Sequence, residues 1–151
     1  MPSTSDNEEI IRVMEMQERT GYKCNDYIEQ QQQQLNAQSQ YSSVSSSASS
    51  SSSNAGVNEI WREKICEWSY QVVDHFDINR EVVAVSLSYL DRYLSTKRVN
   101  KKIFQLAAMT TLYLAMKLYS KKSQPIGSLI ELSRGYFEKD HVEKMEQSIF
   151  R

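Results

Sequence analysis

The sequence predicts an all-α protein in which a five-helix domain follows a short N-terminal helix and a disordered linker rich in serine and glutamine. Three observations predict this class. The 151 residues include only 4 glycines and 2 prolines, so few positions favour turns over helices. Apolar residues recur at helical spacing from residue 58 to the end of the chain. Between residues 29 and 57, by contrast, large apolar side chains are sparse.

The composition narrows the classes of protein to which the chain can belong. Its length suits one ordinary domain. The net charge of −1 provides no general positive field, so we expect neither nucleic acid nor a membrane surface as a partner. Cys24 and Cys66 lie far apart and outside metal-ligand spacing, so we expect no disulfide framework, metal site or cofactor. The polar start MPSTSDNEE does not resemble a signal peptide, and no apolar run reaches the length of a membrane span.

The first segment, residues 1–28, predicts a short amphipathic helix. Ser5 and Glu8 have the spacing of a capping box, and Gly21 is a suitable helix end. The apolar residues at helical spacing between them are Ile10, Val13 and Met14. Residues 29–57, which begin EQQQQQLNAQSQ, cannot bury enough apolar surface to offset their chain entropy. We expect a disordered, solvated linker there in preference to a phosphorylated regulatory tract.

Five helices are expected in residues 58–151. The first spans about Asn58 to Phe76. A turn through Asp77 and Asn79 leads to the second helix, which either residue can cap. The apolar stripe of this second helix consists of Val83, Leu87, Leu90 and Leu94.

The third helix is expected at the centre of the domain. It follows a cap at Asn100 and reads KKIFQLAAMTTLYLAMKLY, in which apolar residues occupy nearly all sides, so other helices must surround it. A short fourth helix begins at Pro125 and ends near Gly135. The fifth helix is cut off by the end of the chain at Arg151, and its apolar residues are Val142, Met145 and Ile149.

Two charged residues fall on apolar helix faces. Arg62 lies at the edge of the apolar face of the first helix, and Asp91 lies within the apolar stripe of the second. Because an unpaired buried charge costs roughly several kcal/mol, these two residues predict a salt bridge between consecutive helices. The alternative, in which each side chain reaches solvent from the edge of its stripe, fits the spacing equally well.

These residues belong to a longer pattern that resembles the cyclin box, the five-helix module of kinase-activating cyclins. The segments WREKICEW and SLSYLDRYLS match the openings of the family's first and second helices. FQLAAMTTLYLAMK matches the Gln-Leu start and Ala-x-Lys end of its third helix, and MEQSIF matches the Met-Glu pair of its fifth. The resemblance covers residues 58–151 and stops before the second repeat of many cyclins. It implies that Arg62 pairs with Asp91.

The resemblance also implies a function. The family's key lysine and glutamate fall at Lys117 and Glu146, with Leu106 as support in the core, and in the family this pair binds around the αC helix of a kinase. We therefore expect an activating or targeting subunit of a cyclin-dependent serine/threonine kinase, which acts in cell-cycle control in the nucleus or cytoplasm. We do not expect an enzyme, because His75 and His141 lie in no nucleophile or metal-ligand pattern.

A second site is implied at Trp61, Ile65, Trp68 and Gln105. In several cyclins these positions form a shallow apolar groove that docks Arg-x-Leu peptides of substrates and inhibitors. Trp61 replaces the family's Met and Ser69 its usual Leu, which changes the shape of the groove. An equally good interpretation is that both tryptophans belong to the core or are covered by the N-terminal helix.

Departures from the family pattern leave two alternative functions open. The run from Leu118 to Lys122 ends in two lysines where the family is commonly acidic, and the fifth helix ends about one turn early. These features suit an inactive or truncated cyclin-like interaction protein. The cyclin fold also occurs in transcription factors as a scaffold, a function that requires a basic groove.

Overall fold

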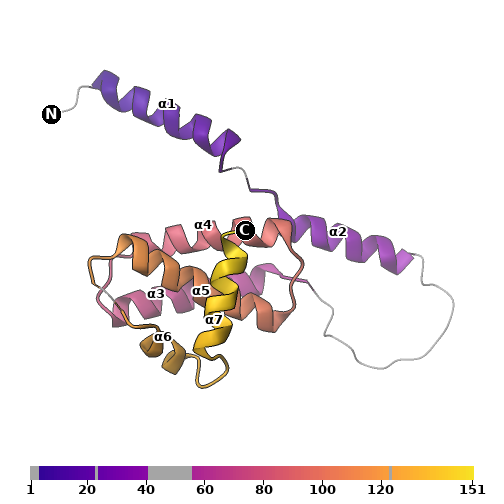
Figure 1. Cartoon of the computed structure of the whole chain (residues 1–151). Coiled ribbons are helices and arrows are strands. Elements are labelled where there is room, and N and C mark those ends of the chain that lie inside the picture. Colours follow the sequence, from indigo (N-terminus) through magenta and orange to yellow (C-terminus); the bar gives the residue numbers. More distant parts are fainter. Residues whose placement is uncertain (1–3, 23, 41–55, 123) are drawn as a thin grey trace.

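The computed structural model describes residues 4–22, 24–40, 56–122 and 124–151, and the regular structure within these ranges is entirely helical. The helices are α1 (Thr4–Thr20), α2 (Tyr27–Gln40), α3 (Glu59–His75), α4 (Glu81–Thr96), α5 (Lys101–Tyr119), α6 (Ile126–Leu132) and α7 (Lys139–Ile149). Figure 1 shows α3 to α7 gathered in one bundle and α1 extending away from it. The predicted all-α class is confirmed, and α3 to α7 are the five helices expected after residue 58.

Helix α5 is the centre of the bundle, as its apolar sequence predicts. It packs against α3, α4, α6 and α7, and α7 crosses it in Figure 1. Asn100 caps the helix, because its Oδ1 accepts a hydrogen bond of 2.9 Å from the backbone N of Ile103. The buried residues of α5 are Phe104, Leu106, Ala107, Ala108, Met109, Thr110, Thr111, Leu112, Leu114, Ala115 and Met116.

Helices α3 and α4 are joined by a tight turn. Asn58 caps α3 through a hydrogen bond of 3.0 Å from the backbone N of Trp61 to its Oδ1. Asp77 takes a left-handed φ of 52°, which reverses the chain. The Oδ1 of Asn79 then accepts a hydrogen bond of 3.0 Å from the backbone N of Glu81, at the start of α4. Of the two residues expected to cap α4, Asn79 and not Asp77 therefore accepts a hydrogen bond from a backbone amide of its first turn.

Helices α6 and α7 are connected by a turn at Arg134 and Gly135, whose φ values are 53° and 79°. Gly135 adopts this left-handed conformation without steric cost. Glu138 and His141 then form a capping box at the start of α7, in which the backbone N of Glu138 donates to His141 Nδ1 over 3.1 Å. His141 therefore has a structural contact within the chain.

The expected disordered linker is partly wrong, because residues 29–40 belong to α2. Glutamine is a good helix former, and Asp26 Oδ1 caps the helix by accepting a hydrogen bond of 2.9 Å from the backbone N of Glu29. Tyr27 is buried in the core and Ile28 packs against it, which fastens α2 to the bundle. Gln31, one turn after Tyr27, is buried beside Gly56. Residues 41–55 lie outside the described residues, and Val57 at the other end of the tract is buried in the core.

Helix α1 forms as predicted but has no buried residue. Its exposed apolar side chains are Ile10, Ile11, Val13, Met14 and Met16. In Figure 1 it lies apart from the bundle, beyond the chain that leads into α2. Among the described helices, neither α1 nor any other is long and apolar enough to cross a membrane.

Candidate functional site

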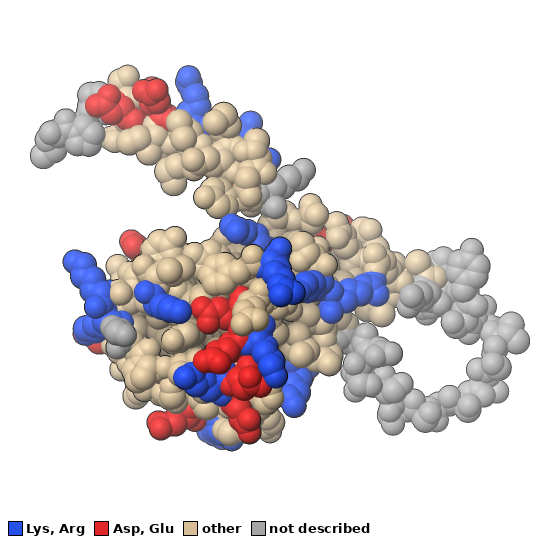
Figure 2. Space-filling model, in the orientation of Figure 1, with Lys and Arg blue, Asp and Glu red and all other residues tan. Residues whose placement is uncertain are grey.

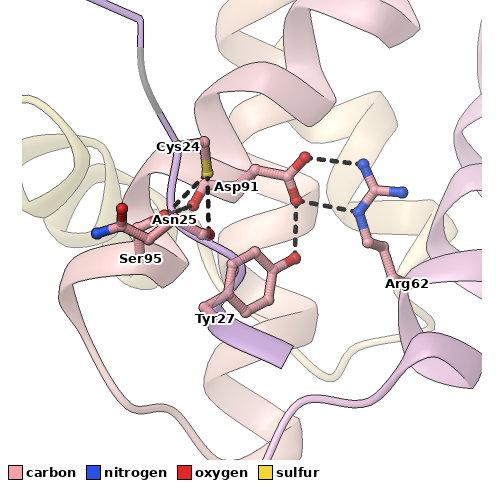
Figure 3. A network of polar contacts seen from close by, with 6 residues as sticks. All are labelled: Cys24, Asn25, Tyr27, Arg62, Asp91 and Ser95. Atoms are coloured by element: carbon pink, nitrogen blue, oxygen red, sulfur yellow. Dashed lines mark hydrogen bonds and ion pairs between the residues drawn. The ribbon is translucent and has the colours of Figure 1, made fainter. Parts of the chain in front are cut away.

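Arg62 and Asp91 meet between α3 and α4 in a bidentate ion pair. The Arg62 Nε donates to Asp91 Oδ1 over 3.0 Å, and the Nη2 donates to Oδ2 over 2.7 Å. Figure 3 shows that a third group completes the network. The hydroxyl of Tyr27 donates to Asp91 Oδ1 over 2.7 Å, so one carboxylate joins α2, α3 and α4.

The surroundings of this network favour one set of protonation states. The hydrogen bonds from Arg62 to Asp91 raise the pKa of the guanidinium above its ordinary value, so Arg62 remains charged. Burial, followed by the hydrogen bond to Asp91, raises the pKa of the Tyr27 phenol. The phenol therefore remains a donor, as the short contact with the carboxylate requires.

A second set of contacts fastens the segment before α2 to α4. Cys24 Sγ and Ser95 Oγ form a hydrogen bond of 2.9 Å, and Ser95 Oγ also donates to the backbone O of Asp91 over 2.7 Å. Neither Tyr27 nor Cys24 was predicted from the sequence as part of a site. The available signal is the pair Asp26 and Glu29, which has capping-box spacing and marks a helix start beside Tyr27.

Lys117 and Glu146 meet at the surface, where the last turn of α5 lies beside α7. The Lys117 Nζ lies 3.4 Å from Glu146 Oε1, and the side chains are 54% and 23% exposed. The same Nζ lies 5.8 Å from the centroid of the Tyr113 ring, one turn earlier on α5. Three exposed apolar residues, Leu118, Tyr119 and Phe150, lie at the same ends of α5 and α7. Tyr119 and Phe150 line a neighbouring pocket with Tyr89 of α4, and Lys117 and Glu146 do not line it. We call the ion pair and these three residues together the α5–α7 surface.

Leu106 is buried, with 8% of its surface exposed. It lies on α5 about three turns before Lys117. The structure therefore places Leu106 in the common core of the bundle and not directly beneath the α5–α7 surface.

The basic run after Lys117 is partly neutralised within the chain. Lys122 Nζ lies 2.6 Å from Asp77 Oδ2, which ties the end of this run to the turn between α3 and α4. The ammonium group lowers the pKa of the Asp77 carboxyl below its ordinary value. Elsewhere on the bundle, Figure 2 shows acidic and basic side chains side by side over α7, so charges of both signs share this face.

Three of the four residues expected in the groove line one pocket between α3, α5 and the turn that precedes α7. These are Ile65, Trp68 and Gln105, and the other lining residues are Lys101, Met109, Leu132, Ser133, Tyr136 and Phe137. Trp61 does not line this pocket. Its ring lies 5.8 Å from the ring of Phe104, against the core. Both tryptophans are only partly buried, and α1 covers neither of them, since none of its residues is buried.

No group of three or more histidine, cysteine, aspartate or glutamate side chains in the described parts of the chain is arranged to hold a metal ion. Cys24 and Cys66 are both free thiols.

Comparisons with known proteins agree on one family. The family model of the cyclin N-terminal domain matches residues 9–151. Cyclin-A3-3 of Arabidopsis thaliana is 28% identical over 88 residues, which are 58% of this chain and 27% of that protein. G2/mitotic-specific cyclin-B of Hydra vulgaris is 26% identical over 97 residues, or 64% of this chain and 27% of that protein. Cyclin-A3-2 of Arabidopsis thaliana is 30% identical over 89 residues, or 58% of this chain and 24% of that protein.

The aligned region spans about a quarter of the length of these relatives. The family match begins within α1, so it includes α2 and its contact with Asp91 as well as the five-helix bundle. On the match over residues 9–151, this chain belongs to the cyclin family and contains its N-terminal domain.

Proposed function

We propose that this chain is a regulatory subunit that binds and activates a cyclin-dependent serine/threonine kinase through the α5–α7 surface. The observation that carries the proposal is the position of Lys117 and Glu146. The resemblance assigns these residues to the family's kinase-binding positions, and they meet at 3.4 Å on two helices that pack together. Such a subunit acts where its kinase does, in the nucleus or the cytoplasm.

The energetics of the pair also favour an interface. An exposed ion pair contributes only about 0–1 kcal/mol to the stability of a fold. The exposed side chains of Leu118, Tyr119 and Phe150 contribute no burial energy to the fold while they face water. Tyrosine and phenylalanine are also enriched in the buried cores of protein interfaces. A partner that covers both these three residues and the ion pair brings Lys117 and Glu146 into a drier environment, where their hydrogen bonds to the partner are stronger.

Activation follows from the two states of a kinase. A protein kinase positions ATP only when its β3 lysine is paired with the glutamate of its αC helix. A rigid surface that binds the assembled form better than the open form shifts the population toward the assembled form. The core around α5 supplies this rigidity, because its buried residues lie on every side of the helix. The chain itself needs no catalytic group for this function.

A kinase assay with matched variants tests the proposal. The chain is mixed with purified cyclin-dependent kinase catalytic subunits, and peptide phosphorylation and affinity are measured for wild type and for Lys117→Ala/Glu146→Ala. We expect the double variant to bind at least about thirty-fold more weakly, which corresponds to about 2 kcal/mol for a desolvated charged contact. The control is Asp140→Ala/Lys144→Ala, which removes an exposed ion pair of 2.7 Å from α7.

The outcomes separate the alternatives. Equal stimulation by wild type and by the Lys117→Ala/Glu146→Ala variant would exclude the α5–α7 surface as the activating contact. Binding without any stimulation would instead indicate an inactive, sequestering cyclin-like protein. Equal loss in the control variant would mean that general charge on α7, and not this pair, determines the affinity.

A further inference from the structure

A second pocket lies beside the α5–α7 surface, between α4 and the ends of α5 and α7. Its lining includes Tyr89, Tyr119 and Phe150 but neither Lys117 nor Glu146, so the ion pair takes no part in it. In Figure 1 the end of α7 reaches α4. The volume of this α4–α7 pocket is about 680 Å³, which lies within the usual range of ligand sites.

The side chains that line the α4–α7 pocket give it a positive charge. Its charged lining residues are Arg92, Lys97 and Arg151, and the lining, all of it described, contains no aspartate or glutamate. Arg151 is the last residue of the sequence, where the terminal carboxylate offsets its charge. Arg92 and Lys97 therefore supply the net positive charge, and an anion that enters the pocket meets no carboxylate side chain.

The residues around the pocket do not cancel this charge. The acidic residues nearest in the sequence to its lining on α4 and α7 are Asp91 and Glu146, and both are already held in ion pairs. From residue 92 to residue 130 the sequence contains eight lysines and arginines and no acidic residue. Burial, followed by a hydrogen bond with Tyr119, raises the pKa of the Tyr89 phenol, so this group stays neutral.

Two aromatic rings hold Arg92 in the pocket. Its Cζ lies 5.4 Å from the centroid of the Tyr22 ring and 6.0 Å from that of the Tyr89 ring, which are cation–π distances. Arg92 is exposed, so its planar fork is accessible to two oxygens of an anion. The charged residues just before Tyr22, Glu18 and Arg19, have opposite signs and add no net charge.

Lys97 and Ser148 supply the other donors. Lys97 Nζ donates a hydrogen bond of 2.7 Å to Ser148 Oγ and lies 5.1 Å from the centroid of the Tyr93 ring. Because Ser148 accepts this hydrogen bond, its hydroxyl hydrogen can be donated to an anion, as can the other hydrogens of the ammonium group. A guanidinium fork, an ammonium and a hydroxyl together suit the three free oxygens of a phosphate monoester.

The shape of the pocket indicates which kind of phosphate fits. Arg92 and Lys97 are exposed at its rim, whereas Tyr93 and Leu114 are buried at its floor. A phosphate at the rim leaves the apolar floor to a neighbouring apolar side chain of the same ligand. The short side chains of phosphoserine and phosphothreonine hold their phosphate close to the peptide backbone, and so at the rim. The longer phosphotyrosine would direct its phosphate to the floor, away from both cations.

We infer that the α4–α7 pocket binds a partner protein through a phosphorylated serine or threonine that is followed closely by an apolar residue. The phosphate pairs with Arg92 and Lys97 and accepts a hydrogen bond from Ser148. The apolar residue of the partner contacts Leu114 and Phe150. Phosphorylation of the partner thereby controls its binding to this chain.

Matched peptides test this inference on the whole chain without any kinase. All contain a leucine two residues after the position that differs, which is phosphoserine, serine, aspartate or phosphotyrosine, and affinities are measured by calorimetry. We expect the phosphoserine peptide to bind at least about ten-fold more tightly than the serine peptide at low salt, because the phosphate adds charge-assisted hydrogen bonds. The aspartate peptide, with less charge, and the phosphotyrosine peptide are expected to bind more weakly than the phosphoserine peptide.

Two double variants with the same change in net charge locate the binding. Arg92→Gln/Lys97→Gln is expected to remove the preference for phosphoserine over serine. Arg98→Gln/Lys102→Gln, at exposed residues that do not line the pocket, is expected to keep this preference. Circular dichroism of both variants verifies that their helices are intact.

Four results would overturn the inference. These are equal affinities for the phosphoserine and serine peptides, equal losses in the two double variants, binding of the phosphotyrosine peptide as tight as that of phosphoserine, and tighter binding of a single-stranded oligonucleotide than of the phosphoserine peptide. The last result would indicate a nucleic-acid site. Since no kinase takes part and the ion pair of the α5–α7 surface is unchanged in both variants, each result leaves the proposed kinase contact intact.

Discussion

At the scale of single residues, the main feature is the carboxylate of Asp91, which accepts hydrogen bonds from two residues on different helices. Asp91 accepts both hydrogen bonds of the Arg62 fork and a third from Tyr27. The side chains of Arg62 and Asp91 are 36% and 21% exposed, so the ion pair is partly shielded from solvent but still in contact with water. Three charge-assisted hydrogen bonds on one group make it a joint between α2, α3 and α4.

Replacing Asp91 with alanine removes all three acceptors at once. We expect Asp91→Ala to lower the free energy of unfolding by about 2–3 kcal/mol, somewhat less than for a fully buried pair because solvent screens Arg62. Urea denaturation followed by circular dichroism measures the change. Asp74→Ala is the matched control, because Asp74 and Arg80 form a bidentate pair with the same distances, 3.0 and 2.7 Å, but at an exposed site. Equal losses in the two variants would mean that the Asp91 network is no stronger than a surface pair.

Tyr27→Phe isolates the third hydrogen bond of the network. We expect a loss of about 2 kcal/mol at neutral pH, the usual value for a hydrogen bond to a charged group. The pKa of Tyr27 is raised by folding, so this contribution is complete below the ordinary phenol pKa of 10.0 and declines as the pH rises above it. The stability difference between wild type and variant is therefore expected to shrink between about pH 10 and about pH 11. A difference that stays constant over this range would contradict the raised pKa.

The ion pair was accessible from the sequence, but its third member was not. Arg62 and Asp91 each interrupt an apolar helix face, and a charged group buried in such a position is unfavourable unless an opposite charge pairs with it. Tyr27 interrupts no pattern, because tyrosines occur both in protein cores and on protein surfaces. Its role depends on the position of α2 against the bundle, which is a property of the tertiary structure.

At the scale of helices, local chemistry predicted the bundle well. The cap at Asn100 and the all-round apolar sequence of α5 are confirmed, and Asn58, the expected start of the first helix, is its cap. Helix α2 was missed because its glutamines have low hydrophobicity, which is typical of a linker, although glutamine also has a good helix propensity. Tyr27 is buried in the core and Ile28 packs against it, and a composition average does not detect these two contacts of α2 with the bundle.

Deletion of the two N-terminal helices is expected to give unequal effects. Removal of residues 1–20 should leave the thermal midpoint nearly unchanged, because α1 has no buried residue. Removal of residues 1–40 also takes away Tyr27 and the hydrogen bond of Cys24 to Ser95, so we expect a clear fall in the midpoint. Thermal unfolding followed at the helical circular dichroism signal measures both. A large loss on removing α1 alone would show that this helix packs against the bundle.

At the scale of the whole molecule, two surfaces lie near opposite ends of α5. Lys101, which lines the pocket beside Trp68, and Lys117, in the α5–α7 surface, are separated by roughly 24 Å along the helix. We expect a kinase bound at the α5–α7 surface to make no contact with Lys101, so Lys101→Glu is expected to leave kinase stimulation by the chain unchanged. A loss of stimulation in this variant, measured in the same kinase assay, would show that the two surfaces are coupled.

Hydrogen exchange shows whether a kinase binds the α5–α7 surface. Backbone exchange of the chain is compared, by mass spectrometry, in the presence and absence of a cyclin-dependent kinase catalytic subunit. We expect slower exchange in the last turns of α5 and α7, around Lys117 and Glu146, with little change at the pocket beside Trp68. Protection confined to the pocket or to α1, or no protection anywhere, would contradict it.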